Sequence, residues 1–132
     1  METIDKIIID TDICVDYLRG RSRVLEKLIF SLTISITSIS VFELRKGALL
    51  SSKKEKRLQE VESLISEFEV LEFGSNEAKI AADIDVELQS SGFMIDIRDL
   101  LIASVCLSNN LPLLTGNPAH FKKVKGLKLF AL

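Results

Sequence analysis

Short apolar runs alternate along the chain with longer segments of helical spacing. The continuously apolar Ile7-Ile8-Ile9 ends at acidic residues, which is typical of a central parallel strand covered on both faces. Residues 32–37 alternate strictly between apolar and hydroxyl side chains, which predicts a strand with two unlike faces. Briefer apolar runs predict further strands at 70–73, 112–115 and 127–130. We therefore expect a sheet of four to five strands.

Apolar residues at helical spacing fill the intervals between these strands. The predicted helices cover residues 13–19, 22–30, 38–50, 53–68, 75–91 and 96–109. Gly20 is expected to end the helix at 13–19, Gly92 to end the helix at 75–91, and Ser38 to cap the helix at 38–50. Residues 116–118, Gly-Asn-Pro, are expected to form a turn. Strands that alternate with helices predict an α/β sandwich with a mostly parallel central sheet.

The composition fits one globular domain that spans residues 1–132. Hydrophobic residues make up 47% of the chain and charged residues 27%, which excludes disorder and a fibrous repeat. Acids among the first six residues argue against a secretory signal, and no apolar stretch reaches about 18 residues. We therefore expect a soluble cytoplasmic protein without a membrane span. Cys14 and Cys106 lie in apolar helical patterns and are expected to be buried thiols.

Acidic and hydroxyl residues follow three of the predicted strands. Asp10, Thr11 and Asp12 follow the first strand, Thr37 and Ser38 the second, and Thr115, Gly116 and Asn117 the strand at 112–115. Sites in open α/β sheets form beyond the carboxyl ends of the strands. The polar residues therefore collect where this architecture places a functional site.

Two further acids lie on the apolar faces of predicted helices. Glu43 shares a face with Ile39 and Gly47, and Asp99 shares one with Ile102 and Cys106. A buried carboxylate costs several kcal/mol unless it is paired or binds a metal.

Each acid also has a purely structural explanation. Asp10 and Asp12 are good capping residues for the first helix, and Asp96 is a good N-cap with Asp99 in the same first turn. Lys46 could pair with Glu43.

The acids indicate a specific function only when they are considered together. If Asp10, Asp12, Glu43 and Asp99 converge, four like charges share one pocket, and no Arg or Lys motif is expected to face them. Such a cluster raises its pKa values or recruits a cation. Oxygen ligands favour Mg²⁺ or Mn²⁺ over zinc, and the single histidine, His120, cannot supply a histidine-based site. Partly open carboxylate sites of this kind serve phosphoryl chemistry.

Four blocks of the sequence resemble PIN-domain VapC-type toxins. They are IIIDTDICVDYLRG (7–20), TSISVFELRKG (37–47), DLLIA (99–103), and LLTGN (113–117) with His120-Phe121. The blocks follow the order and spacing of that family across nearly the whole chain. The resemblance implies a three-layer α/β/α PIN-like sandwich and an endoribonuclease that hydrolyses RNA phosphodiesters with Mg²⁺ or Mn²⁺. It also implies the toxin half of a type II toxin–antitoxin system.

The resemblance assigns roles to individual residues. Asp10, Glu43 and Asp99 would bind the metal, with Glu43 completing its shell or taking a proton from water, and Thr11 and Thr115 would support them. Asp12, where the family often has Asn, would orient water. Asn117 replaces a frequent family acid, which puts a second metal in question, and Asp96 would act at the rim.

The resemblance also implies partners. The chain would form a homodimer and would be inhibited by a VapB-type antitoxin whose basic tail enters the acidic site. The net charge of −2 gives no overall attraction to RNA. Arg19, Arg21, Arg45 and Lys46 follow the acidic blocks in the sequence and are the candidates for a basic RNA path.

Two other functions compete with this one. A haloacid-dehalogenase-like phosphatase would use Asp10 as nucleophile and Asp12 as acid/base, but it leaves Glu43 without a role and needs Asp99 to follow a strand. A PIN domain that binds without turnover would agree with the missing family acid and the negative net charge.

Overall fold

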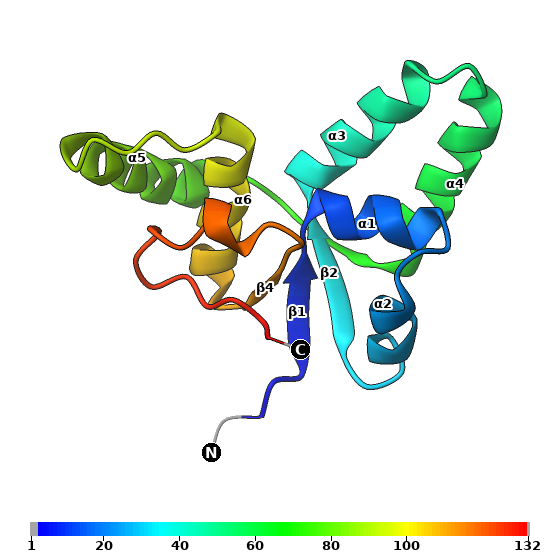
Figure 1. Ribbon diagram of the computed structural model, residues 1–132, viewed down its shortest axis with the longest axis horizontal. Helices are drawn as coiled ribbons and strands as arrows, with labels where there is room; N and C mark the ends of the chain where they lie inside the picture. Colours follow the sequence, from blue (N-terminus) through cyan, green and yellow to red (C-terminus); the bar gives the residue numbers. More distant parts are fainter. Residues whose placement is uncertain (1–2, 132) are drawn as a thin grey trace.

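A four-stranded parallel sheet forms the centre of the computed structural model, which describes residues 3–131 (Figure 1). Strand β1 (Lys6–Ile9) pairs with β2 (Thr33–Thr37) on one side and with β4 (Leu113–Leu114) on the other, and β2 pairs with β3 (Glu69–Leu71). The strand order is β3-β2-β1-β4. The chain therefore leaves β1, at Asp10, in the middle of the carboxyl edge of the sheet.

Helices cover both faces of this sheet (Figure 1). One layer consists of α1 (Thr11–Leu18), α2 (Arg23–Leu28), α3 (Ser38–Leu49) and α4 (Lys54–Glu67). The opposite layer consists of α5 (Ser75–Ser90), α6 (Ile97–Asn109) and the short 3₁₀ helix η1 (Pro118–His120). The three-layer α/β/α architecture and the parallel sheet are thus confirmed.

The apolar run of β1 joins the two layers. Ile7 and Ile9 pack into one core with Leu44 of α3 and Leu64 of α4, while Ile8 packs into the other core beside Ile102 of α6. All three isoleucines have no exposed surface. A fully buried strand explains why the sequence here is continuously apolar and does not alternate.

Three local predictions were wrong. The predicted strand at 127–130 amounts to a single bridge between Leu113 and Leu129, and β3 ends at Leu71 and not at Phe73. The cap of α3 is Thr37, whose hydroxyl accepts a hydrogen bond from Ser40 N at 3.2 Å. The reason is that Thr37 still has extended backbone angles, and the hydroxyl of Ser38 instead accepts a hydrogen bond from Phe73 N at 3.1 Å.

Two expectations from the composition can be compared with the structure. Cys14 and Cys106 are free and buried, one in each core, as predicted. Within residues 3–131, no helix has the length and apolar character needed to cross a membrane.

Candidate active site

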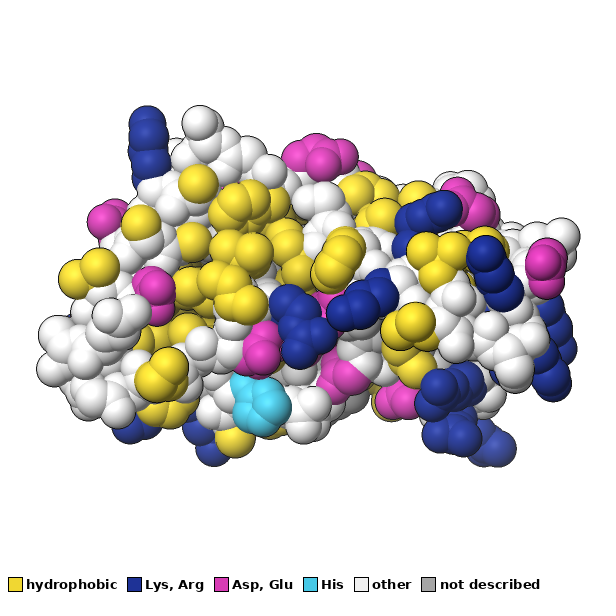
Figure 2. Space-filling model, turned by 90° about the horizontal axis from the view of Figure 1, so that it is seen from above, with side chains coloured by type: hydrophobic (Ala, Val, Ile, Leu, Met, Phe, Trp, Pro, Cys, Tyr) yellow, Lys and Arg dark blue, Asp and Glu magenta, His cyan; other side chains and the backbone are white. Residues whose placement is uncertain are grey.

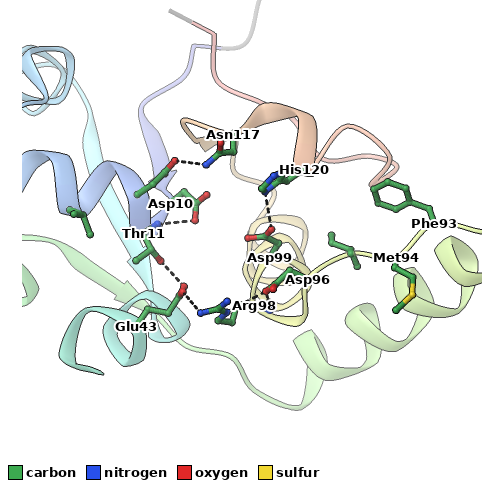
Figure 3. A pocket seen from close by; sticks show the side chains of 13 residues that line it. Asp10, Thr11, Glu43, Phe93, Met94, Asp96, Arg98, Asp99, Asn117 and His120 are labelled. Carbon is green, nitrogen blue, oxygen red and sulfur yellow. Dashed lines mark hydrogen bonds and ion pairs between the residues drawn. The ribbon is translucent and has the colours of Figure 1, made fainter. Parts of the chain in front are cut away.

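An open pocket of about 540 Å³ lies at the carboxyl edge of the sheet, between the two helical layers (Figure 3). Five acidic residues line it: Asp10, Asp12, Glu43, Asp96 and Asp99. They come from the end of β1, the first turn of α1, the middle of α3 and the start of α6. The structure therefore brings together the acids that the sequence singled out.

Asp10 is the most buried of these acids, with 7% of its surface exposed. Its Oδ1 accepts a hydrogen bond from Thr11 N at 2.8 Å, and its Oδ2 accepts one from the Thr115 hydroxyl at 2.7 Å. Burial raises the pKa of Asp10 from 3.8 to about 6, and the negative charges of Asp12 and Asp99 add to this effect. Asp10 is both the N-cap of α1 and one of the residues that line the pocket.

Asp12 is held by the loop that follows β4. Its Oδ2 accepts hydrogen bonds from Gly116 N at 3.0 Å and from the Asn117 side-chain amide at 3.1 Å, and its Oδ1 accepts one from Ile13 N at 2.8 Å. Partial burial raises its pKa. Asn117 thus serves as a donor that fixes Asp12.

Glu43 is tied to α1 and α6. The Thr11 hydroxyl lies 2.8 Å from Glu43 Oε1, to which it can donate, and 2.8 Å from the Ser40 hydroxyl. The cation beside Glu43 is Arg98, with Nη1 3.4 Å from Oε2. The expected partner, Lys46, instead lies over the Phe42 ring at 5.9 Å, so that pairing was wrong.

Arg98 faces the acids from the layer of α6, contrary to the expectation that no Arg or Lys would do so, and His120 lies beside Asp99. Asp96 caps α6 by accepting from Arg98 N at 2.9 Å, and Arg98 Nε lies 3.3 Å from the same oxygen. Nδ1 of His120 lies 3.4 Å from Asp99 Oδ2 (Figure 3).

The pKa values of the two acids at the start of α6 shift in opposite directions. Hydrogen bonds from Arg98 lower the pKa of Asp96. Burial raises the pKa of Asp99, with added effects from the charges of Asp96 and Glu43, and His120 opposes the shift.

Sequence reasoning missed Arg98, although Arg98 is the direct neighbour of Asp99. The reason is that helical spacing assigns a residue to a face of the helix, whereas the long side chain of Arg98 reaches from the first turn of α6 across the pocket. Ser40, which is fully buried beside Thr11, was also not predicted.

The predicted basic RNA path does not line the pocket. Arg45 forms an ion pair with Glu62, and Arg21 is exposed in the loop after α1. Arg19 borders a smaller groove of about 180 Å³ between α1, α3 and α4.

The carboxylates share one pocket but do not form a preorganised metal-binding site. Among residues 3–131, no three His, Cys, Asp or Glu side chains lie close enough together to hold an ion as they stand. Thr11, Arg98, Thr115 and His120 instead occupy oxygens of Asp10, Glu43 and Asp99.

A model of the PIN-domain family matches residues 7–127. The chain belongs to the PIN-domain family. Ribonuclease VapC2 of Rickettsia felis is 32% identical over 92% of this chain and 94% of its own length. The tRNA(fMet)-specific endonuclease VapC of Salmonella typhimurium is 30% identical over 94% of this chain and 96% of its own length.

A solved structure shows the same fold. VapBC2 from Rickettsia felis, bound to a DNA fragment from their promoter, aligns with a TM-score of 0.86 at 31% identity, over 95% of this PIN domain and 97% of the solved chain. Membership in this family is incompatible with the haloacid-dehalogenase-like alternative. The position of Asp99 within α6, and not after a strand, agrees with that conclusion.

Proposed function

We propose that this PIN domain is a divalent-metal-dependent endoribonuclease and the toxin of a type II toxin–antitoxin pair. The observation that carries the proposal is that Asp10, Glu43 and Asp99, from three different elements, line one pocket at the carboxyl edge of the sheet. The names of the relatives, a ribonuclease and a tRNA-specific endonuclease, support RNA as the substrate.

The donor chemistry of the pocket fits Mg²⁺ or Mn²⁺. Asp10, Glu43 and Asp99 offer oxygen ligands. Burial raises the pKa of Asp10, the charges of Asp12 and Asp99 add to this effect, and a bound cation would oppose it. These three residues would hold the ion after Glu43 and Asp99 exchange their contacts with Arg98 and His120 for it. When bound, a divalent ion supplies positive charge for the phosphate and acidifies an attacking water.

Two hydroxyl groups orient the acids, and Asp12 would orient the water. The Thr115 hydroxyl fixes Asp10, and the Thr11 hydroxyl fixes Glu43. With an ion bound, Glu43 would complete its shell or accept a proton from the attacking water. Asp12, held by Gly116 and Asn117, would orient that water through its carboxylate.

We further propose a VapB-type antitoxin as the partner. The VapBC2 structure that this chain resembles supports that assignment. A basic antitoxin tail would be complementary to a pocket lined by five acids in a chain of net charge −2.

RNA cleavage by the purified chain tests the ribonuclease proposal. With Mg²⁺ or Mn²⁺ we expect cleavage of tRNA or single-stranded RNA, and with EDTA we expect none. Asp10→Asn and Asp99→Asn should each lower the rate about 100-fold or more, because each removes a charged ligand oxygen. Asp83→Asn, exposed on α5, is the matched control and should cleave at the wild-type rate.

Two outcomes would contradict the proposal. Full activity in both Asp10→Asn and Asp99→Asn would refute the site. Metal binding by the wild type without RNA cleavage would favour the PIN domain that binds without turnover.

A further inference from the structure

Arg98 lies in the acidic pocket, whereas the residues of the predicted basic RNA path do not line it. Among the described residues that line the acidic pocket, Arg98 is the sole arginine or lysine. Its side chain is 51% exposed and extends from the start of α6 toward Glu43 on α3 (Figure 3). Figure 2 shows basic side chains among carboxylates beside the histidine, near the middle of this face. Arg98 therefore places a permanent positive charge in a pocket of acids.

The ion pairs of Arg98 are loose. Nη1 lies 3.4 Å from Glu43 and Nε lies 3.3 Å from Asp96, whereas strong charge-assisted hydrogen bonds measure about 2.7–2.9 Å. The Asp96 oxygen already accepts from Arg98 N at 2.9 Å. Exposed pairs of this kind contribute little to stability. These contacts orient the guanidinium without locking it in place.

The guanidinium keeps donors for a further acceptor. Arginine carries five N–H groups in a rigid fork, and the contacts of Arg98 with residues 3–131 use Nη1 and Nε. Both N–H groups of Nη2 are left for another oxygen. If Glu43 exchanges Arg98 for a metal ion, Nη1 is released as well.

An RNA strand that enters this acidic pocket needs a positively charged donor for its phosphates. Five carboxyl residues line the pocket and repel the RNA backbone, and the net charge of −2 adds no general attraction. The arginine fork matches the geometry of phosphate oxygens.

We propose that Arg98 binds a backbone phosphate of the RNA that enters the pocket, as a substrate-binding residue. This inference rests on the proposed ribonuclease function, in which RNA is the substrate. Glu43 and Asp96 hold the guanidinium between α3 and α6, so the phosphate would be bound next to Asp10 and Asp99 and not along the outer faces of α1 and α3.

The salt dependence of RNA binding tests this role. Binding of a labelled single-stranded RNA is measured by fluorescence anisotropy in an Asp10→Asn background, so that the measurement does not depend on cleavage. Arg98→Gln should weaken binding about tenfold at about 50 mM salt, to a similar extent for different sequences. The plot of log affinity against log salt should become less steep by about 0.7, the value for one phosphate contact on a single strand.

Two variants serve as controls. Arg57→Gln removes an arginine that is similarly exposed, at 40%, and similarly paired, with Glu60, but outside this pocket, and it should leave affinity and slope unchanged. Arg98→Lys keeps the charge but loses the fork, so it should keep the slope and recover part of the affinity.

An Arg98→Gln slope equal to that of Arg57→Gln would overturn the inference. So would unchanged RNA binding combined with tighter Mn²⁺ binding by Arg98→Gln, because Arg98 would then be a counter-ion of Glu43 and nothing more. A wild-type chain that binds RNA without cutting it would contradict the ribonuclease proposal, and the slope would still decide the role of Arg98.

Discussion

The burial of Asp10 links the candidate site to the stability of the fold. The pKa of Asp10 is about 6 in the folded chain, mainly because of burial, whereas its ordinary value is 3.8. Between these values the folded state binds more protons than the unfolded state, so stability falls as the pH rises from about 4 to above 6. Because of this residue, the free energy of unfolding of the metal-free protein should be lower at neutral pH than at pH 4, by up to about 3 kcal/mol.

Asp10→Asn should remove this pH-dependent loss. In EDTA, we expect the variant to be more stable than the wild type at pH 8, by up to about 3 kcal/mol, and similar to it at pH 4. Urea unfolding at the two pH values measures the difference, and Asp83→Asn is the control because Asp83 is exposed on α5. An Asp10→Asn variant that is less stable than the wild type at pH 8 would contradict the assignment of Asp10 as a buried, unneutralised acid.

The acids of the pocket could be predicted from the sequence, whereas their partners could not. Asp10 directly follows an apolar strand, and Glu43 and Asp99 interrupt apolar helix faces. Each of these signals lies within a few residues of the acid. The contact between Glu43 and Arg98 joins positions in opposite helical layers, and it depends on how the side chain of Arg98 reaches across the pocket. Sequence spacing contains no such information.

At the scale of elements, the loop after β4 sets the position of Asp12. A Cβ atom at Gly116 would lie 2.5 Å from Asp12 Oδ2, the oxygen that accepts from Gly116 N at 3.0 Å. The close approach of this backbone to a carboxylate requires glycine. The carboxylate of Asp12 is the group that can move, so an added methyl should displace it from Gly116 and Asn117.

Gly116→Ala should therefore lower RNA cleavage more than it lowers stability. We expect a loss of about 10- to 100-fold in the cleavage rate, because a displaced Asp12 no longer orients the water. Gly47→Ala is the matched control, since a Cβ at this position in α3 would meet nothing within 4 Å, and it should cleave normally and be more stable by up to about 1 kcal/mol. Cleavage and urea unfolding are measured on both variants, and normal cleavage by Gly116→Ala would contradict the role of Asp12.

The elements that the sequence predicted well are those with a strong burial pattern. The apolar run 7–9 and the alternating run 32–37 became β1 and β2 because nearly all of their apolar side chains are buried. The run 127–130 has similar apolar alternation, but Leu127 and Leu129 pack against the second core while a single bridge to Leu113 forms. An apolar pattern predicts burial, and the backbone pairing that defines a strand does not follow from it.

At the scale of the whole molecule, the pocket depends on both helical layers. Asp12 and Glu43 belong to the layer of α1 and α3, whereas Asp99 belongs to the layer of α6. The buried β1 strand joins the two layers and ends at Asp10. The distances between the acids are therefore set by packing on opposite faces of one strand, which explains why residues far apart in the sequence form one site.

The homodimer expected from the sequence is a prediction about the whole molecule. Figure 2 shows apolar side chains gathered over the half of the molecule that contains α5 and α6. In these helices and the loop between them, Val86 is 68% exposed, Met94 87% and Ile97 60%. Exposed apolar surface of this kind marks an interaction face. Because Met94 also lines the pocket, a partner on this face would border the candidate active site.

We expect light scattering at micromolar concentration to give twice the monomer mass of 14.7 kDa. Replacing Val86 and Ile97 together by serine should shift the mass toward the monomer, because the double variant removes apolar contact area without touching either core. Leu50→Ser, at a residue 78% exposed beyond α3 in the other layer, is the control and should leave the dimer intact. A monomeric wild type would contradict the dimer, and dissociation by Leu50→Ser alone would contradict the choice of face.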